Sequence, residues 1–134
     1  MTIVVGYVPK PEGRAALHRA VDEARLRGQS LVIVNASRGD AYVDAGYAPV
    51  QDVEIVKSQL DSSGVDYQLR QLVGGREPAD EVLNVAKDVD AELIVIGLRR
   101  RTPVGKLILG STAQRILLGA TCSVLAVKAS DPAA

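Results

Sequence analysis

Along this chain of 134 residues, segments with a strand-like pattern of apolar residues alternate with segments that have a helix-like pattern. Short runs rich in β-branched residues predict buried strands at 3–8, 31–34 and 92–96 and a terminal edge strand at Ser123–Lys128. A weaker alternation at 67–72 predicts a strand nearer a sheet edge. Between these runs, apolar residues recur every three or four positions, as on one face of a helix. The predicted helical stripes consist of Leu17, Val21 and Ala24; Val53, Val56 and Leu60; Ala79, Val82, Leu83 and Ala86; and Ala113, Ile116, Leu117 and Ala120.

The alternation of strands and helices predicts one α/β domain at 1–129, followed by a frayed tail at 130–134. Continuously apolar strands are typical of a parallel sheet that helices cover on both faces. Ligands of such sheets bind beyond the carboxyl ends of the strands, where the winding reverses. If the first strand lies beside the fourth, this crevice is bounded by the turn at 9–13 and by the segment after Gly97.

The composition excludes several classes of function. The chain has no Phe or Trp, which argues against stacking of single-stranded nucleic acid, and its 16 basic and 16 acidic residues leave no net charge to attract DNA or membrane. No apolar run reaches the ~18 residues of a membrane helix, and the N-terminus lacks the features of a signal peptide. The single cysteine, Cys122, suits a reducing interior. We therefore expect a soluble, cytoplasmic protein that binds neither nucleic acid nor membrane.

The candidate chemistry lies between 93 and 114. The apolar run there ends at Gly97, a basic segment follows at 99–101, and Gly110 and Ser111 precede the last helix. The first backbone N–H groups of a helix have no partner inside it, and the helix dipole favours negative charge at that end. The segment therefore predicts an anion-binding site at the start of the last helix.

No catalytic constellation accompanies this segment. The sequence contains no complete P-loop, dinucleotide-binding, serine-hydrolase, zinc-protease or CxxC motif, so we expect no metal site and no enzyme beyond a slow ATPase. The single histidine, His18, lies on a polar helix face and is interpreted as solvent-exposed. Ser111 and Gln114 also match a capping box, S-x-x-Q, which would stabilise the helix without any ligand. Cys122 is interpreted as a small buried residue rather than a redox sensor.

Taken together, the motifs of the chain resemble those of the universal stress protein family. The matching pieces are the opening IVVG, GxxP before the third helix, ELIVIG, the glycine-bearing segment, GSTAQRIL and the terminal CSVLAVK. The resemblance covers nearly the whole chain and implies an open, Rossmann-like, five-stranded parallel sheet with strand order 3-2-1-4-5. It also implies a homodimer through the last strand and, in one branch of the family, ATP bound by the motif G-x2-G-x9-G-[ST].

This motif maps onto the chain with two departures. Gly97 matches its first glycine, and Gly110 and Ser111 match its end, but Arg100 stands where the middle glycine is expected. Arginine lacks the conformational freedom of glycine, although its guanidinium group can bind phosphate directly. The Asp that ATP-binding relatives carry after the first strand is replaced by Val8.

The resemblance implies, as the leading hypothesis, a homodimeric stress-response module that binds ATP or AMP. Its site residues would be Val8, Pro9 and Ala36 near the adenosine, and Gly97, Arg99, Arg100, Gly110, Ser111 and Thr112 near the phosphates. The alternative hypothesis is a stress protein scaffold that binds no nucleotide and acts through its dimer surface and the loop at 38–49. An uninterrupted apolar edge strand at Ser123–Lys128 favours a dimer on physical grounds too, because its unpaired backbone groups can pair with a second copy.

Overall fold

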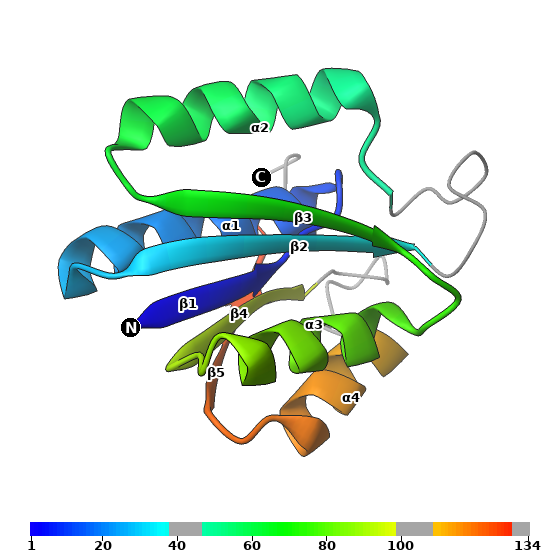
Figure 1. The fold of residues 1–134 in the computed structure, drawn as a ribbon. Coiled ribbons are helices and arrows are strands. Elements are labelled where there is room, and N and C mark those ends of the chain that lie inside the picture. The colour runs from blue at the N-terminus through cyan, green and yellow to red at the C-terminus, as the bar shows by residue number, and fades with distance from the viewer. Residues whose placement is uncertain (38–46, 99–108, 130–134) are drawn as a thin grey trace.

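The computed structural model describes residues 1–37, 47–98 and 109–129 (Figure 1). Within these ranges, strands and helices alternate along the chain in the predicted order. The strands are β1 (Thr2–Gly6), β2 (Ser30–Ser37), β3 (Tyr67–Val73), β4 (Leu93–Leu98) and β5 (Ser123–Lys128). The helices are α1 (Pro11–Arg27), α2 (Val50–Ser63), α3 (Pro78–Asp88) and α4 (Ser111–Gly119).

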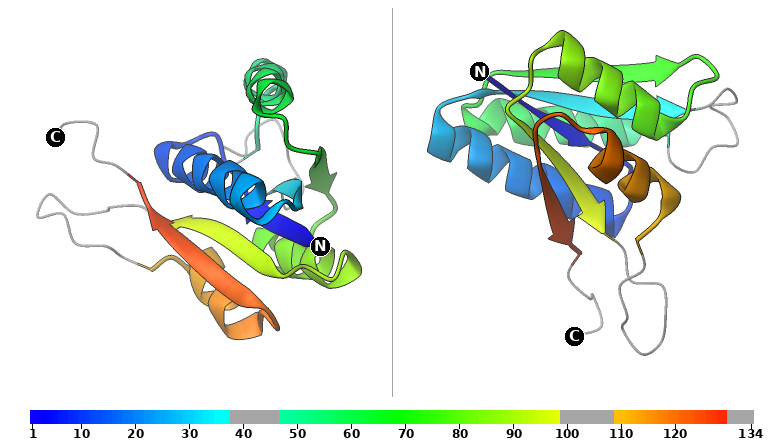
Figure 2. Two further views of the ribbon diagram at one scale, coloured as in Figure 1. Left: turned by 90° about the vertical axis from the view of Figure 1, so that its left-hand side faces the viewer. Right: turned by 90° about the horizontal axis from the view of Figure 1, so that it is seen from below.

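The strands form one parallel, five-stranded sheet with the order β3-β2-β1-β4-β5. β1 lies at the centre, where Val4 is aligned with Val32 of β2 and with Ile94 of β4. α1 and α2 cover one face of the sheet, and α3 and α4 cover the other (Figures 1 and 2). The winding therefore reverses between β1 and β4, which makes their carboxyl ends the switch point of the sheet. The predicted fold class and strand order are confirmed.

Two hydrophobic clusters lie on the two faces of the sheet, because successive side chains of a strand point to opposite sides. Val5, Ile33 and Val95 belong to the cluster under α1 and α2, whereas Val4 and Ile94 belong to the cluster under α3 and α4. All five side chains are fully buried. Burial on both faces explains why β1, β2 and β4 are continuously apolar, and the partly exposed β3 confirms the predicted edge position.

The first helix begins earlier than the sequence pattern predicted. Pro11 is its first residue, a position where the missing backbone N–H costs nothing, so much of the predicted turn at 9–13 is helical. The predicted ends of the first two helices are confirmed. Gly28 follows α1 with φ 64°, and Gly64 follows α2 with φ 77°, a backbone conformation that favours glycine.

Some other expectations need correction. β1 ends at Gly6 rather than at position 8, because the chain already turns toward α1. β2 and β4 were predicted to end at positions 34 and 96, but they continue through Ser37 and Leu98. Both extensions keep their pairing with the neighbouring strand, since Ser37 is aligned with β3 and Leu98 with β5. The predicted apolar stripe of α4 is too wide, because Leu117 is 41% exposed.

Candidate functional site

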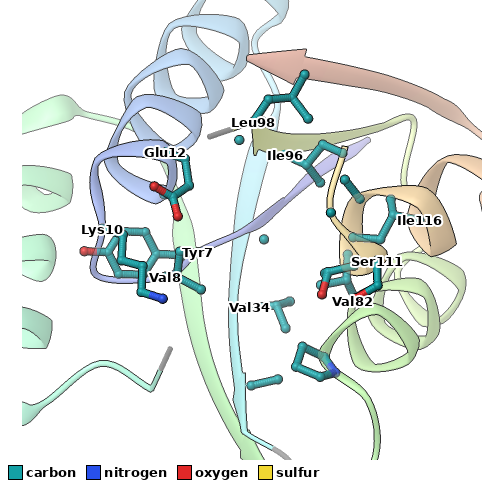
Figure 3. A pocket seen from close by; sticks show the side chains of 18 residues that line it. Tyr7, Val8, Lys10, Glu12, Val34, Val82, Ile96, Leu98, Ser111 and Ile116 are labelled. Atoms are coloured by element: carbon teal, nitrogen blue, oxygen red, sulfur yellow. The ribbon is translucent and has the colours of Figure 1, made fainter. Parts of the chain in front are cut away.

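A cavity of about 320 Å³ opens at the carboxyl ends of β1 and β4, between the first turns of α1 and α4 (Figure 3). Its floor is apolar and includes Val34, Val82, Ile96 and Ile116, from two strands and two helices. The cavity thus lies at the switch point of the sheet, where parallel α/β proteins bind ligands. Its volume is at the lower end of the range for small-molecule sites, roughly 300 to 1,000 Å³.

The start of α4 forms one wall of this cavity. Gly110 is the N-cap residue, and Ser111 and Thr112 follow in the first helical turn with exposed side chains. The backbone N–H groups of a first turn have no acceptor inside their own helix and lie at the positive end of its dipole. This wall therefore offers hydrogen-bond donors to an anion.

The predicted capping box at this helix start is wrong. Ser111 lies inside α4 rather than at its N-cap, and no side chain caps the helix. The side chain of Gln114 donates to the carbonyl oxygen of Leu109, with 3.4 Å between the two atoms. The Ser111 hydroxyl is thus not used to cap the helix, and Figure 3 shows it on the cavity wall.

The opposite wall carries charges of both signs. Lys10 and Glu12, at the start of α1, both line the cavity and are half-buried. Figure 3 shows Glu12 on the side of the cavity opposite Ser111. Glu12 lies in the first turn of α1, so the dipole of that helix favours its negative charge.

Gly97 allows the close approach of the two elements that carry this wall. It lies in β4, and a Cβ atom added there would clash with the backbone carbonyl oxygen of Glu12. The absence of a side chain lets the first turn of α1 pack directly on β4. At Gly110, by contrast, an added Cβ atom would meet nothing within 4 Å. Gly97 is therefore needed for packing, whereas no described residue restricts the space at Gly110.

A buried polar network holds the carboxyl ends of β1, β2 and β3 together. The side-chain amide of Asn35, which is fully buried in β2, donates to the Tyr7 carbonyl oxygen at 2.8 Å. Its oxygen accepts from the Ala48 backbone N–H at 2.8 Å and from the Gln71 side chain at 3.1 Å. Gln71 also donates to the Ala48 carbonyl oxygen at 3.0 Å. These bonds fix the backbone at the edge of the cavity.

Tyr7 links the cavity to α2. Its hydroxyl group donates to Oδ2 of Asp52 at 2.7 Å, and Arg14 lies 3.7 Å from the same carboxylate. Burial, reinforced by the hydrogen bond to Asp52 and by the negative charge of that residue, raises the pKa of Tyr7 well above its usual value. The phenol therefore stays protonated and acts as a structural tie rather than as a nucleophile.

Most of the predicted site residues come together around the cavity. Those that line it are Val8, Ala36, Gly97, Gly110, Ser111 and Thr112. Pro9 is described by the structure but is not among the lining residues. Arg99 and Arg100 lie outside the described residues, as do positions 38–46 of the predicted loop. Lys10 and Glu12 were missed because they were assigned to a turn; the signal was Pro11, which can begin a helix at that point.

Two other reactive side chains lie away from the cavity. His18 is exposed on α1, as predicted, with its ring 3.7 Å from Asp22. Cys122 is half-buried against the cluster under α3 and α4, and burial raises the pKa of its thiol. Among the residues that the structure describes, no group of three or more His, Cys, Asp or Glu side chains could hold a metal ion. In the same ranges, no helix has the length and apolar character needed to cross a membrane.

The fold and the cavity can now be compared with known proteins. The sequence profile of the universal stress protein family matches residues 1–128. The chain belongs to this family. A universal stress protein of Mycolicibacterium smegmatis is 50% identical over 126 residues, which cover 94% of this chain and 96% of the relative.

Solved structures of universal stress proteins share the fold. One from Archaeoglobus fulgidus superposes with a TM-score of 0.80 at 34% identity and covers 96% of this chain and 98% of its own. A universal stress protein from Archaeoglobus fulgidus in complex with dAMP superposes with a TM-score of 0.70 at 29% identity, again over 96% and 98% of the two chains. The resemblance inferred from the motifs is thus confirmed over the length of the domain.

Proposed function

We propose that this universal stress protein binds an adenine nucleotide, ATP or AMP, in the cavity between α1 and α4. The observation that carries the proposal is the position of the α4 N-terminus, whose backbone donors lie beside an apolar cavity at the switch point of the sheet. The complex of a 29% identical universal stress protein with dAMP supports the choice of nucleotide.

The cavity has a wall of hydrogen-bond donors and an apolar floor, and we assign a different part of the nucleotide to each. The phosphate groups would accept hydrogen bonds from the first turn of α4, at Gly110, Ser111 and Thr112. The adenine base would lie over the apolar side chains of Val34 and Ala36, where its flat faces lose contact with water. A further contribution from Arg99 and Arg100 stays a prediction from the sequence.

The test is a titration of the purified protein with AMP and with ATP, in which calorimetry measures the heat of binding. We expect saturable binding by the wild type and about tenfold weaker binding by Ser111→Ala, because a hydrogen bond to a charged phosphate oxygen is lost. The structure makes this variant informative, since Ser111 caps no helix and its removal leaves stability within about 0.5 kcal/mol. Ser58→Ala, on an exposed position of α2, is the matched control and keeps wild-type affinity.

The scaffold alternative predicts the opposite result. Two results together would reject nucleotide binding. Calorimetry would detect no heat with either nucleotide, and mass spectrometry would detect no nucleotide released when the purified protein is denatured. The protein would then act through its surfaces alone.

We also propose that the protein forms a homodimer through β5. In the described part of the chain, β5 pairs with β4 on one side and with no strand on the other, so one row of its backbone groups has no partner in a sheet. Antiparallel pairing with β5 of a second copy would satisfy these groups by twofold symmetry.

A further inference from the structure

Glu12 is a carboxylate without a hydrogen-bond or ion-pair partner among the residues that the structure describes. Its side chain lines the cavity and is half-buried. Within the described ranges, no residue forms a hydrogen bond or an ion pair with this carboxylate, not even Lys10 on the same wall. A half-buried charge gains from polar partners, because the surrounding protein replaces part of its hydration. The cavity thus contains an acceptor that a ligand can satisfy.

The two walls of the cavity select different chemical groups. The α4 wall presents donors and suits an anion, whereas the ionised Glu12 can only accept hydrogen bonds and repels negative charge. A matching ligand has an anionic group at one end and hydroxyl or amino donors on its opposite side. Lys10 partly balances the charge of Glu12, so an anionic ligand is still admitted.

We propose that Glu12 is a specificity-determining residue that accepts hydrogen bonds from the ribose hydroxyl groups of the bound nucleotide. This inference rests on the proposed function and names the group that the α1 wall recognises. With the phosphate at Ser111 and the base over the apolar floor, the sugar would lie between them, and its hydroxyl groups would face the wall that carries Glu12. The two carboxylate oxygens match two neighbouring hydroxyl donors.

The experiment compares AMP with 2′-deoxy-AMP and 3′-deoxy-AMP by calorimetry. We expect the wild type to bind AMP about tenfold more tightly than at least one deoxy analogue, since a hydrogen bond to a charged group is lost. Glu12→Ala removes the acceptor, and the preference then falls to less than about twofold. Glu12→Gln keeps one carbonyl acceptor and retains part of the preference. Glu54→Ala, on an exposed position of α2, removes the same charge away from the cavity and keeps the wild-type preference.

The ratio of affinities separates recognition from stability. Replacing Glu12 also removes a favourable charge from the first turn of α1, but any effect of this on folding acts equally on ribo and deoxy ligands. Thermal unfolding of each variant checks that it is folded.

Three results would reject the inference. If the wild type binds AMP and both deoxy analogues equally, Glu12 does not recognise the ribose hydroxyl groups, although the proposed function stands. If Glu12→Ala keeps the preference for AMP but tightens binding in proportion to the number of phosphates, Glu12 acts by repulsion instead. If the wild type binds no adenine nucleotide at all, the proposed function itself fails and this inference fails with it.

Discussion

Gly97 and Gly110 show how two residues of one motif can have different physical roles. Gly97 is required by the backbone of α1, whose Glu12 carbonyl oxygen occupies the space that a Cβ atom would need. Gly110 is required by no atom of the described residues, and its φ of −69° is accessible to any residue. The first glycine therefore preserves the shape of the cavity, whereas the second leaves space for a ligand to approach the helix start.

This difference predicts unequal costs of the same substitution. Gly97→Ala should lower the free energy of unfolding by about 2–3 kcal/mol, because the methyl group forces α1 away from β4. Gly110→Ala should cost less than about 1 kcal/mol, since alanine is only a poorer N-cap residue. Urea unfolding of both variants measures the difference. Equal losses would contradict the packing role of Gly97.

At the scale of single residues, one wall of the cavity was easier to predict from the sequence than the other. The residues of the α4 wall could be predicted, because Gly110 and Ser111 directly precede an apolar helical pattern. Pro11 could have indicated where α1 begins, but the place of Glu12 in the cavity also depends on a contact with Gly97, far away in the sequence. Local patterns carry no information about such contacts. The false capping box has a related cause, because its residue pattern alone did not fix where α4 begins.

At the scale of elements, α2 is joined to the sheet by few polar contacts. Its apolar side chains Val56 and Leu60 are buried, and its first turn is held by the bond from Tyr7 to Asp52. Because Tyr7 also lines the cavity, this bond connects the packing of α2 with the edge of the candidate site.

Tyr7→Phe should therefore destabilise the protein by about 1–2 kcal/mol at neutral pH, because the Asp52 carboxylate loses a buried donor. Tyr67→Phe is the matched control, since Tyr67 also bonds a carboxylate, that of Asp61, but at an exposed position. It should cost less. Denaturant unfolding compares the two, and equal losses would show that burial of the bond contributes nothing.

The raised pKa of Tyr7 also predicts a dependence of stability on pH. An unfolded tyrosine loses its proton near about pH 10, whereas folded Tyr7 keeps it to higher pH. The stabilisation is thus fully present below about pH 10 and is lost as the pH rises above that value toward the folded pKa. The free energy difference between wild type and Tyr7→Phe should shrink in this alkaline window. A constant difference up to about pH 11.5 would contradict the prediction.

For the whole molecule, the order of elements contained most of the information needed to predict the fold. Continuous apolar strands and amphipathic helices follow from local composition, and they restrict the chain to a parallel sheet covered on both faces. The choice of neighbours within that sheet is a long-range property. It was accessible only through the resemblance to universal stress proteins, and not through periodicity.

The proposed dimer gives a prediction at the same scale. Ala126 has an exposed side chain in β5, so Ala126→Lys places a charge at the proposed interface without disturbing the core. We expect the wild type to sediment as a dimer whose Tm rises with protein concentration, and the variant to sediment as a monomer whose Tm does not. Ala126→Ser, small and uncharged, should behave like the wild type. A monomeric wild type at all concentrations would reject the interface.

The central strand, β1, is synthesised before the other described strands of the sheet, and its neighbour β4 follows only after α1, α2 and α3. Translation proceeds at roughly 5–20 residues per second, so the β1–β3 half exists for about 1–5 seconds before β4 is complete, with one edge of β1 open. The wall at α4 emerges later still. A ribosome-bound chain therefore has no completed cavity until α4 is exposed, and a ligand of that cavity stabilises folded domains while leaving shorter nascent chains unprotected.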